Sequence, residues 1–135
     1  MKRTRGWPFV LGVAGGLTAG WLWARQKKRL ALLGRSGEIE RRAVERLAVP
    51  ARSTMLGGDG LRLHAVEAGP EDGPLALLLH GFPDCWYGWA RQIPALTGMG
   101  YRVVALDQRG YNLSDKPRKL AAYGLDRLTA DVVAA

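Results

Sequence analysis

The sequence predicts an α/β fold for residues 51–135, because strand and helix patterns alternate along this part of the chain. Residues 74–79 (PLALLL) are apolar at every position, which is typical of a strand covered on both faces in a parallel sheet. A helical pattern follows, and residues 101–106 (YRVVAL) then predict a second buried strand. Strand, helix and strand at this spacing indicate a right-handed crossover unit.

Composition and charge exclude several classes of protein. The 135 residues are 47% hydrophobic and 24% charged, which is ordinary globular usage and unlike that of collagen-like or wholly disordered chains. The single cysteine, Cys85, cannot form an internal disulfide. The net charge of +8 lies within residues 1–50, which hold 11 Lys or Arg and 3 Glu, whereas residues 51–135 are balanced. This distribution argues against a nucleic-acid-binding face on the folded domain.

Residues 7–24 (WPFVLGVAGGLTAGWLWA) predict a membrane anchor, which makes residues 1–24 an N-terminal anchor domain. As a helix these 18 uncharged residues would reach about 27 Å, close to the roughly 30 Å hydrocarbon core of a bilayer. Trp7, Trp21 and Trp23 lie near the two ends, where indole rings prefer the interface. A cleaved signal peptide is the alternative, but the bulky Trp-Leu-Trp end and the basic cluster after it favour a retained anchor.

The anchor and the residues after it carry three further expectations. Gly12, Gly16 and Gly20 recur every four residues, a spacing that allows close helix packing, so they are candidates for a dimer contact. Basic residues are slightly more numerous after the apolar stretch than before it, which favours a single-pass anchor with a cytoplasmic domain. Residues 25–50 predict a basic helical linker, solvated and without a specific site, that ends before Pro50.

After residue 50 the periodicity becomes that of strands. Apolar residues at 61, 63 and 65 alternate with polar ones, which predicts a half-exposed antiparallel strand. Residues 57–60 (GGDG) indicate a hairpin turn before this strand. His64 belongs to the polar set, so we expect it to be a surface histidine.

The helix between the two buried strands is expected to begin at Asp84, a good N-cap residue. Its apolar positions are at residues 86, 89, 93 and 96, and it is expected to run to the glycines at 98 and 100. Trp86 and Trp89 are expected in the core, although Trp86 is also a candidate for the lining of a substrate pocket. No histidine is placed to activate Cys85, which we expect to be an inert buried thiol.

Two loops follow the predicted parallel strands, residues 80–84 (HGFPD) and residues 107–111 (DQRGY). The carboxyl ends of parallel strands are where loops present backbone groups to a ligand. With their flanks, HGFPDCWYGWARQIPAL followed by GYRVVALDQRGYNLSDKP resembles the front half of an α/β-hydrolase of the epoxide hydrolase group. The resemblance covers residues 53–135 and implies the N-terminal half of that fold's sheet, with about four strands.

The resemblance implies an oxyanion loop formed by His80, Gly81, Phe82 and Pro83. In this fold the main-chain N–H at the position of Phe82 stabilises negative charge that develops on a reacting oxygen. By similarity Pro83 follows a cis peptide, and Gly81 allows a close approach of the backbone. His80 is then structural, bonding within the loop, because the catalytic base of the family comes near the C-terminus of a complete chain.

The nucleophile, acid and histidine of the family are not found in this sequence. Neither G-x-S-x-G nor its aspartate version occurs, and Asp107 and Arg109 are expected to be structural, with Gly110 permitting the turn of their loop. Residues 125–135 (LDRLTADVVAA) predict a helix without a cap at its end, so we expect the chain to stop before the nucleophile strand. The 135 residues alone are therefore expected to be inactive and, with one strand edge unpaired, unstable.

The full-length protein is expected to be a hydrolase, most like an epoxide hydrolase. The resemblance implies that an aspartate attacks an epoxide carbon and that a histidine-activated water cleaves the resulting ester. The alternatives are a haloalkane dehalogenase or esterase of the same fold, or a non-catalytic membrane-anchored module. The expected partner is a small hydrophobic substrate such as an epoxide, and neither a metal nor an organic cofactor is implied.

Overall fold

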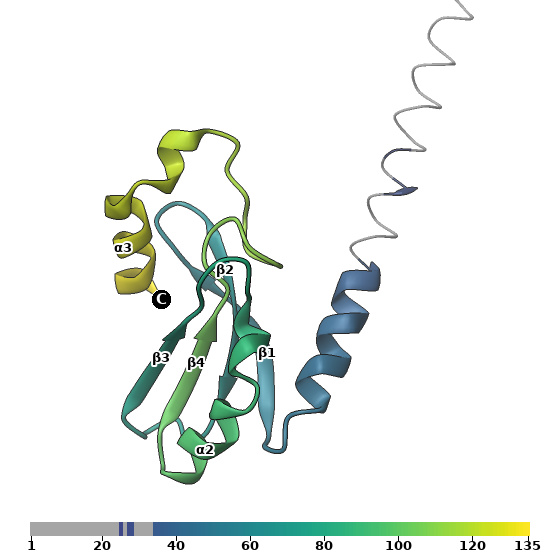
Figure 1. Cartoon of the computed structure of the whole chain (residues 1–135), viewed down its shortest axis with the longest axis vertical. Helices are drawn as coiled ribbons and strands as arrows, with labels where there is room; N and C mark the ends of the chain where they lie inside the picture. Colours follow the sequence, from purple (N-terminus) through teal and green to yellow (C-terminus); the bar gives the residue numbers. More distant parts are fainter. Residues whose placement is uncertain (1–24, 26, 29–33) are drawn as a thin grey trace, which may run out of the picture. The chain divides into compact units, whose positions relative to one another are not determined.

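The computed structural model describes residues 34–135 together with residues 25, 27 and 28 (Figure 1). Residues 34–45 are helical and precede a four-stranded sheet. In chain order the further elements are β1 (Ala51–Gly57), β2 (Arg62–Ala68), β3 (Leu75–Leu79), the 3-10 helix η1 (Trp86–Trp89), α2 (Gln92–Gly98), β4 (Arg102–Leu106), the 3-10 helix η2 (Leu120–Tyr123) and α3 (Leu125–Ala134). Strands and helices alternate after β2, so the predicted α/β class is confirmed for these residues.

The sheet has the strand order β1-β2-β4-β3. β1 and β2 form an antiparallel hairpin in which Gly57 lies opposite Arg62, which confirms the predicted turn. β3 and β4 are parallel, with Leu79 opposite Leu106, and β4 also pairs antiparallel with β2. β2 and β4 are therefore central strands, and β3 and β4 end at the same edge of the sheet.

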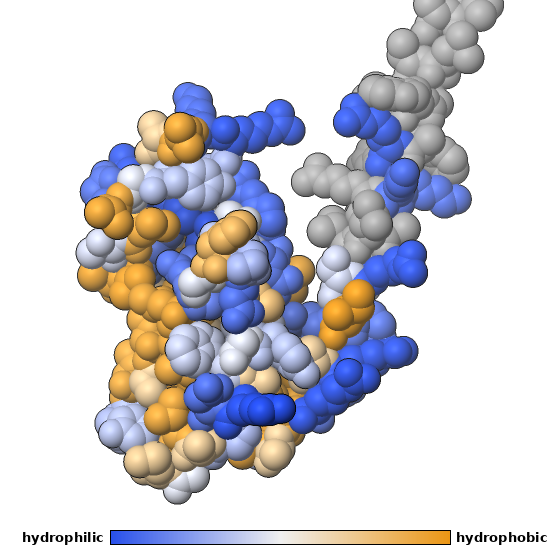
Figure 2. All heavy atoms as spheres, viewed as in Figure 1, coloured by the Kyte–Doolittle hydropathy of each residue, from blue (hydrophilic) through white to orange (hydrophobic). Residues whose placement is uncertain are grey.

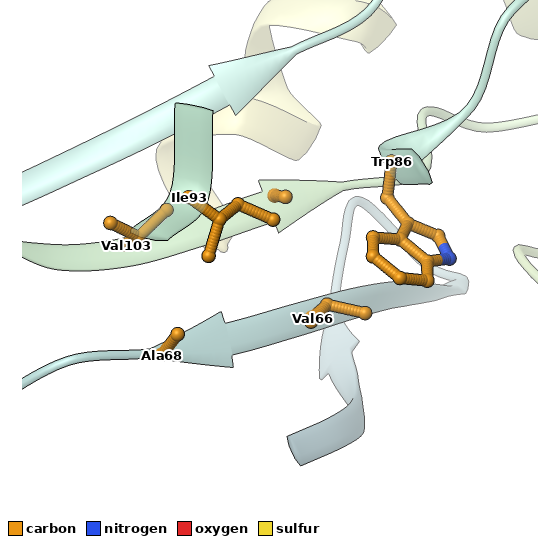
Figure 3. Packing of buried hydrophobic residues seen from close by; sticks show 6 residues of the cluster. Val66, Ala68, Trp86, Ile93 and Val103 are labelled. Carbon is orange, nitrogen blue, oxygen red and sulfur yellow. The ribbon is translucent and has the colours of Figure 1, made fainter. Parts of the chain in front are cut away.

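Hydrophobic side chains pack on both faces of this sheet. On one face Val66 of β2 and Val103 of β4 pack with Trp86 of η1 and Ile93 of α2 (Figure 3). A second cluster consists of residues from the alternate positions of β2 and β4, namely Leu63, Ala65, Val104 and Leu106. Successive side chains of a strand point to opposite faces, which explains why neighbouring residues join different clusters. The expected core position of Trp86 is confirmed, since this side chain is almost fully buried.

β2 is covered on both faces, and the prediction that His64 lies at the surface is wrong. Six of its seven residues are buried, and His64 is only 1% exposed. Alternating apolar and polar residues indicated one solvated face, but the polar side chains of His64 and Glu67 have partners inside the protein. Glu67 is paired with Arg52 and His64 with Asp107, so both polar residues are accommodated beside the core.

The helix predicted from Asp84 to the glycines is divided into η1 and α2. Pro94 explains the division, because proline is tolerated in the first turn of a helix but disrupts a helix interior. α2 begins at Gln92, which places Pro94 in its first turn. The side chain of Asp84 does bond the backbone locally, since its Oδ1 accepts a hydrogen bond from the Cys85 N–H at 2.8 Å.

β3 is less covered than its sequence predicts. Leu75 is 61% exposed and Leu79 is 39% exposed. β4 lies on one side of β3, and no strand of the described residues lies on the other. Hydrophobic residues gather along this side of the molecule, below α3 (Figure 2). An all-apolar strand that is half exposed has an unpaired edge with main-chain groups available for another strand.

The compact unit that contains the sheet begins at Glu38 and extends to Ala135, so it starts before the expected domain boundary at residue 51. The helix expected within residues 25–50 is confirmed over residues 34–45. Ala43, Val44 and Leu47 pack against the core cluster that contains Trp86. Residues 38–47 are therefore part of the fold, where the sequence predicted a solvated linker.

The predicted membrane anchor, residues 7–24, lies outside the described residues, and so do Gly12, Gly16 and Gly20. Within the described part of the chain, no helix has both the length and the apolar character needed to cross a membrane. The anchor and its dimer contact therefore stay predictions.

α3 is attached to the sheet through a buried ion pair between Arg109 and Asp131. Arg109 Nε lies 2.5 Å from Asp131 Oδ2, its Nη2 lies 2.7 Å from Oδ1, and both residues are almost fully buried. Asp131 also accepts a hydrogen bond from the Asp59 N–H in the hairpin turn, at 2.9 Å. The guanidinium lowers the pKa of Asp131, although burial alone would raise it.

Replacing Asp131 with alanine should strongly destabilise the natural full-length protein. Arg109 would keep its charge in a buried position without a carboxylate, which typically costs about 3 to 5 kcal/mol of unfolding free energy. Asp126→Ala on the same helix is the matched control, because the Asp126 side chain is 79% exposed and its loss should cost about 1 kcal/mol or less. Urea unfolding measures both values, and equal losses in the two variants would contradict the prediction.

Candidate functional site

The two loops singled out by the sequence lie next to each other at one edge of the sheet. Residues 80–84 follow β3, residues 107–111 follow β4, and these strands are parallel neighbours. The Gln108 side chain donates a hydrogen bond to the main-chain carbonyl of His80. The Tyr111 ring meets the His80 ring edge to face, with centroids 4.7 Å apart. The carboxyl ends of β3 and β4 therefore form one connected structure.

His80 holds the first loop in place. Its Nε2 is 3.2 Å from the main-chain nitrogen of Gln108, and its Nδ1 is 2.9 Å from the carbonyl oxygen of Gly81. A backbone N–H can only donate, so Nε2 is the acceptor and the proton resides on Nδ1, which donates to Gly81. Both ring nitrogens are thus occupied within the loops, in agreement with the structural role expected for His80.

The Gly81 carbonyl fixes the direction of the next amide. It accepts one hydrogen bond from His80 Nδ1 and a second from the Asp84 N–H at 2.9 Å. The C=O and N–H of a trans peptide point in opposite directions, so the Phe82 N–H faces away from both donors. Among the described residues, the Phe82 N–H has no hydrogen-bond partner. It is a preoriented donor that is free to bind a negatively charged oxygen.

An open hollow of about 320 Å³ lies at this loop and is lined by Gly81, Phe82, Pro83 and Asp84. The peptide between Phe82 and Pro83 is cis, as the resemblance implies. The Phe82 side chain is 86% exposed. A Cβ atom added at Gly81 would meet no other atom within 4 Å. Among the described residues, none therefore comes as close to the Gly81 backbone as the resemblance led us to expect.

Trp86 does not line this hollow. It borders a separate cavity of about 500 Å³ that Glu40, Cys85 and Tyr87 also line, so its assignment to a substrate pocket stays a prediction. Burial raises the pKa of the neighbouring Cys85 thiol. The thiolate is the reactive form, so this environment agrees with the inert thiol expected at Cys85.

Asp107 is a fully buried carboxylate that joins four parts of the structure. Its Oδ1 accepts a hydrogen bond from the Trp86 N–H at 2.8 Å. Its Oδ2 lies 2.7 Å from His64 Nδ1 and accepts a hydrogen bond from Asn112 Nδ2 at 2.8 Å. Burial alone would raise the pKa of Asp107, but the hydrogen bonds, that of His64 foremost, lower it below its ordinary value. The ionised carboxylate lies directly after β4. It therefore links this strand to β2 through His64, to η1 through Trp86 and to the loop after β4 through Asn112.

His64, Ser53 and Asp107 have the spacing of a hydrolytic triad but not its chemistry. Ser53 Oγ lies 2.8 Å from His64 Nε2, and Asp107 lies at Nδ1. Glu40 adds a second carboxylate, with Oε1 3.2 Å from Nε2. Burial disfavours the imidazolium, yet the hydrogen bond that His64 donates to Asp107 and the close contact with the Glu40 carboxylate raise the pKa of His64 to about 9. A histidine that is already protonated at neutral pH cannot accept the proton of a serine.

The remaining predicted positions of the second loop agree with a structural role. Arg109 is paired with Asp131, and Gly110 has a φ of +90°, a conformation that favours glycine.

Sequence reasoning missed Glu40 and Asp131. The signal for Asp131 is its place on the same helix face as the half-buried Leu128, where an acid needs a buried partner. No cluster of His, Cys, Asp and Glu in the described residues is arranged to hold a metal ion.

The protonation of His64 should make stability depend on pH. The pKa of His64 is about 9 in the folded protein and ordinarily 6.5, so its contribution is complete below pH 6.5 and disappears as the pH rises through 9. The loss of unfolding free energy should be on the order of 3 kcal/mol between these limits. Urea unfolding of the natural full-length protein from pH 6 to pH 9.5 measures it, with His64→Gln as the control. A wild-type protein no more pH-dependent than this variant would disprove the assignment.

Comparison with known proteins agrees with this geometry. Residues 74–135 match the family described as alpha/beta hydrolase fold. The AB hydrolase superfamily protein YfhM of Bacillus subtilis is 57% identical over 75 residues, which are 56% of this chain and 26% of the relative. Epoxide hydrolase B of Mycobacterium tuberculosis is 59% identical over 76 residues, which are 55% of this chain and 21% of the relative.

Solved structures show the same similarity. The crystal structure of epoxide hydrolase A from Mycobacterium thermoresistibile superimposes with a TM-score of 0.62 and 46% sequence identity, over 63% of this chain and 27% of that protein. The chain thus spans about a quarter of the length of these relatives. Together with the geometry of the two loops, these matches identify the sheet and loops of residues 51–135 as part of an α/β-hydrolase fold that is similar to the epoxide hydrolases.

Proposed function

We propose that the natural full-length protein hydrolyses epoxides and that the Phe82 N–H is one donor of its oxyanion hole. The observation that carries this proposal is the direction of that N–H, which is fixed through the Gly81 carbonyl and has no partner among the described residues. The 59% identity with epoxide hydrolase B supports epoxides as the substrate class. The substrate would be a small hydrophobic epoxide.

The proposed reaction forms an ester and then cleaves it. A carboxylate nucleophile attacks an epoxide carbon, the C–O bond breaks, the ring oxygen takes up a proton to become a hydroxyl, and a hydroxyalkyl ester remains on the protein, whose hydrolysis by water releases the diol and restores the carboxylate. When water adds to that ester, its carbonyl oxygen becomes negatively charged, and the Phe82 N–H stabilises this charge. The two histidines of the sequence, His64 and His80, are both held in the interactions described above. We therefore expect neither of them to be the base of this reaction.

The test is an assay of diol formation from a small hydrophobic epoxide by the natural full-length protein. His80→Ala leaves the Asp84 N–H as the single donor to the Gly81 carbonyl, so the Phe82 N–H is held less firmly, and kcat should fall by up to about 100-fold. Met99→Ala is the control and should retain wild-type kcat, because the Met99 side chain is 72% exposed and lies before β4, whereas both loops follow the carboxyl ends of β3 and β4. Haloalkanes and esters are assayed in parallel, since dehalogenation or ester hydrolysis would use the same N–H. A wild-type protein that forms no diol, or a His80→Ala variant with normal kcat, would refute the proposal.

We also propose that residues 7–24 anchor the protein in a membrane, with the hydrolase domain on the cytoplasmic side. The support is the uncharged stretch of 18 residues with tryptophans near its ends and basic residues on both sides. Close packing of two anchors through Gly12, Gly16 and Gly20 is part of the same proposal.

Membrane fractionation tests the anchor. The full-length protein should remain in the membrane pellet after alkaline carbonate extraction, and deletion of residues 1–24 should move it to the supernatant. Replacement of the glycines at 12, 16 and 20 with leucine should leave it in the pellet, because the stretch stays apolar, but should weaken crosslinking between copies. Full-length protein in the supernatant would exclude the anchor.

A further inference from the structure

Glu40 differs from the other charged residues of its helix in where its side chain lies. Glu38, Arg41 and Glu45 form ion pairs at the solvent-exposed surface. The side chain of Glu40 is only 9% exposed, and its Oε1 lies 3.2 Å from His64 Nε2. A buried carboxylate is costly unless it is paired, so this contact needs an explanation beyond the packing of the helix.

A series of contacts connects Glu40 with the chain just beyond the oxyanion loop. His64 Nδ1 lies 2.7 Å from Asp107 Oδ2, and Asp107 Oδ1 accepts the Trp86 N–H at 2.8 Å. Trp86 begins η1, two residues after the loop ends at Asp84. Three interactions thus connect a helix that precedes the sheet with the backbone that leaves the loop.

The oxyanion loop is held at both ends by consecutive residues of the second loop. At its start, Gln108 donates hydrogen bonds to the ring and to the carbonyl of His80. Beyond its end, Asp107 holds the Trp86 N–H. The position of Asp107 relative to Gln108 therefore sets the path of the chain between them, which contains the Phe82 amide.

The charge of His64 determines how firmly Asp107 is held. Two carboxylates face its ring, Glu40 from the helix and Asp107 from the end of β4, and the third polar group at the ring is the neutral Ser53 hydroxyl. An imidazolium forms a stronger, charge-assisted hydrogen bond to Asp107 than a neutral ring does. Glu40 favours the imidazolium, because its own negative charge lies next to Nε2.

We propose that Glu40 is a positioning residue for the oxyanion loop, which it orients through His64 and Asp107. The proposal rests on the function proposed above, but its first two measurements do not depend on activity. It gives the segment before the sheet a role in catalysis, where its packing alone would indicate only a structural one.

The test compares Glu40→Gln with Glu45→Gln in the natural full-length protein. Both substitutions remove one negative charge from the same helix and keep the side-chain shape, but Glu45 is at the surface, paired with Arg41. NMR titration of the imidazole should show the pKa of His64 lower by about one unit or more in Glu40→Gln, since a nearby opposite charge is lost. Amide hydrogen exchange at Trp86 should be about tenfold faster in this variant, and both values should stay at wild type in Glu45→Gln.

Kinetics supply the third measurement. A loosened oxyanion donor weakens an interaction of the transition state, so kcat should fall by about 3- to 10-fold in Glu40→Gln, with KM changed less than about twofold. The wild-type kcat should be constant up to about pH 9, whereas that of Glu40→Gln should begin to fall at lower pH, where its His64 loses the proton. Glu40→Asp retains the charge and should recover part of the lost kcat.

The outcomes separate the two proposals. If the wild-type protein forms no diol, the proposed function fails, and the His64 pKa and the Trp86 exchange rate still decide whether Glu40 orients the loop. A lowered His64 pKa with unchanged Trp86 exchange would overturn the positioning role, as would an unchanged kcat in an active protein. If Glu40→Gln does not fold, Glu40→Asp takes its place, and a lowered His64 pKa in that variant with wild-type exchange at Trp86 would overturn the proposal.

Discussion

The buried carboxylate of Asp107 is the interaction on which the arrangement of the site depends. It has no exposed surface, and an unpaired carboxylate in such a place would be strongly unfavourable. It is stable there because an imidazolium, a main-chain N–H and a side-chain amide all donate to it. Each donor comes from a different segment, so satisfying one charge also fixes the positions of β2, η1 and the loop after β4. A polar cluster at the end of a sheet thereby does what hydrophobic packing cannot do, because hydrogen bonds have defined directions.

The loop of residues 80–84 gains its order from a different set of hydrogen bonds. A backbone N–H can serve as a donor for a reacting oxygen only if it is held in position before the reaction, so that little reorganisation is needed. Here the position is set from the far side of the peptide, where His80 and the Asp84 N–H both bind the Gly81 carbonyl. The amide of Phe82 is left unpaired on the opposite side. A histidine that looks like a catalytic base thus acts through geometry, with both ring nitrogens engaged.

Much of the fold follows from local sequence patterns. The parallel pair β3 and β4, the hairpin turn after β1 and the helix over residues 125–134 all agree with periodicity and turn residues read along the chain. The loop of residues 80–84 was predicted from its resemblance to a known motif, which also implied the cis peptide before Pro83. The division of the helix after Asp84 was also accessible, because Pro94 is incompatible with one continuous helix.

What the sequence by itself determined is therefore the class of fold, the order of its elements and the loop that carries the candidate donor, since these depend on residues close together in the chain. The tertiary structure alone decided that His64 is buried, that Glu40 contacts it and that Asp107 bears a charge shared among several segments. The physical reason is that the cost of burying a charge depends on partners far away in sequence. Alternation along β2 shows which side chains share a face, but only the neighbouring helix and strands decide whether that face meets water.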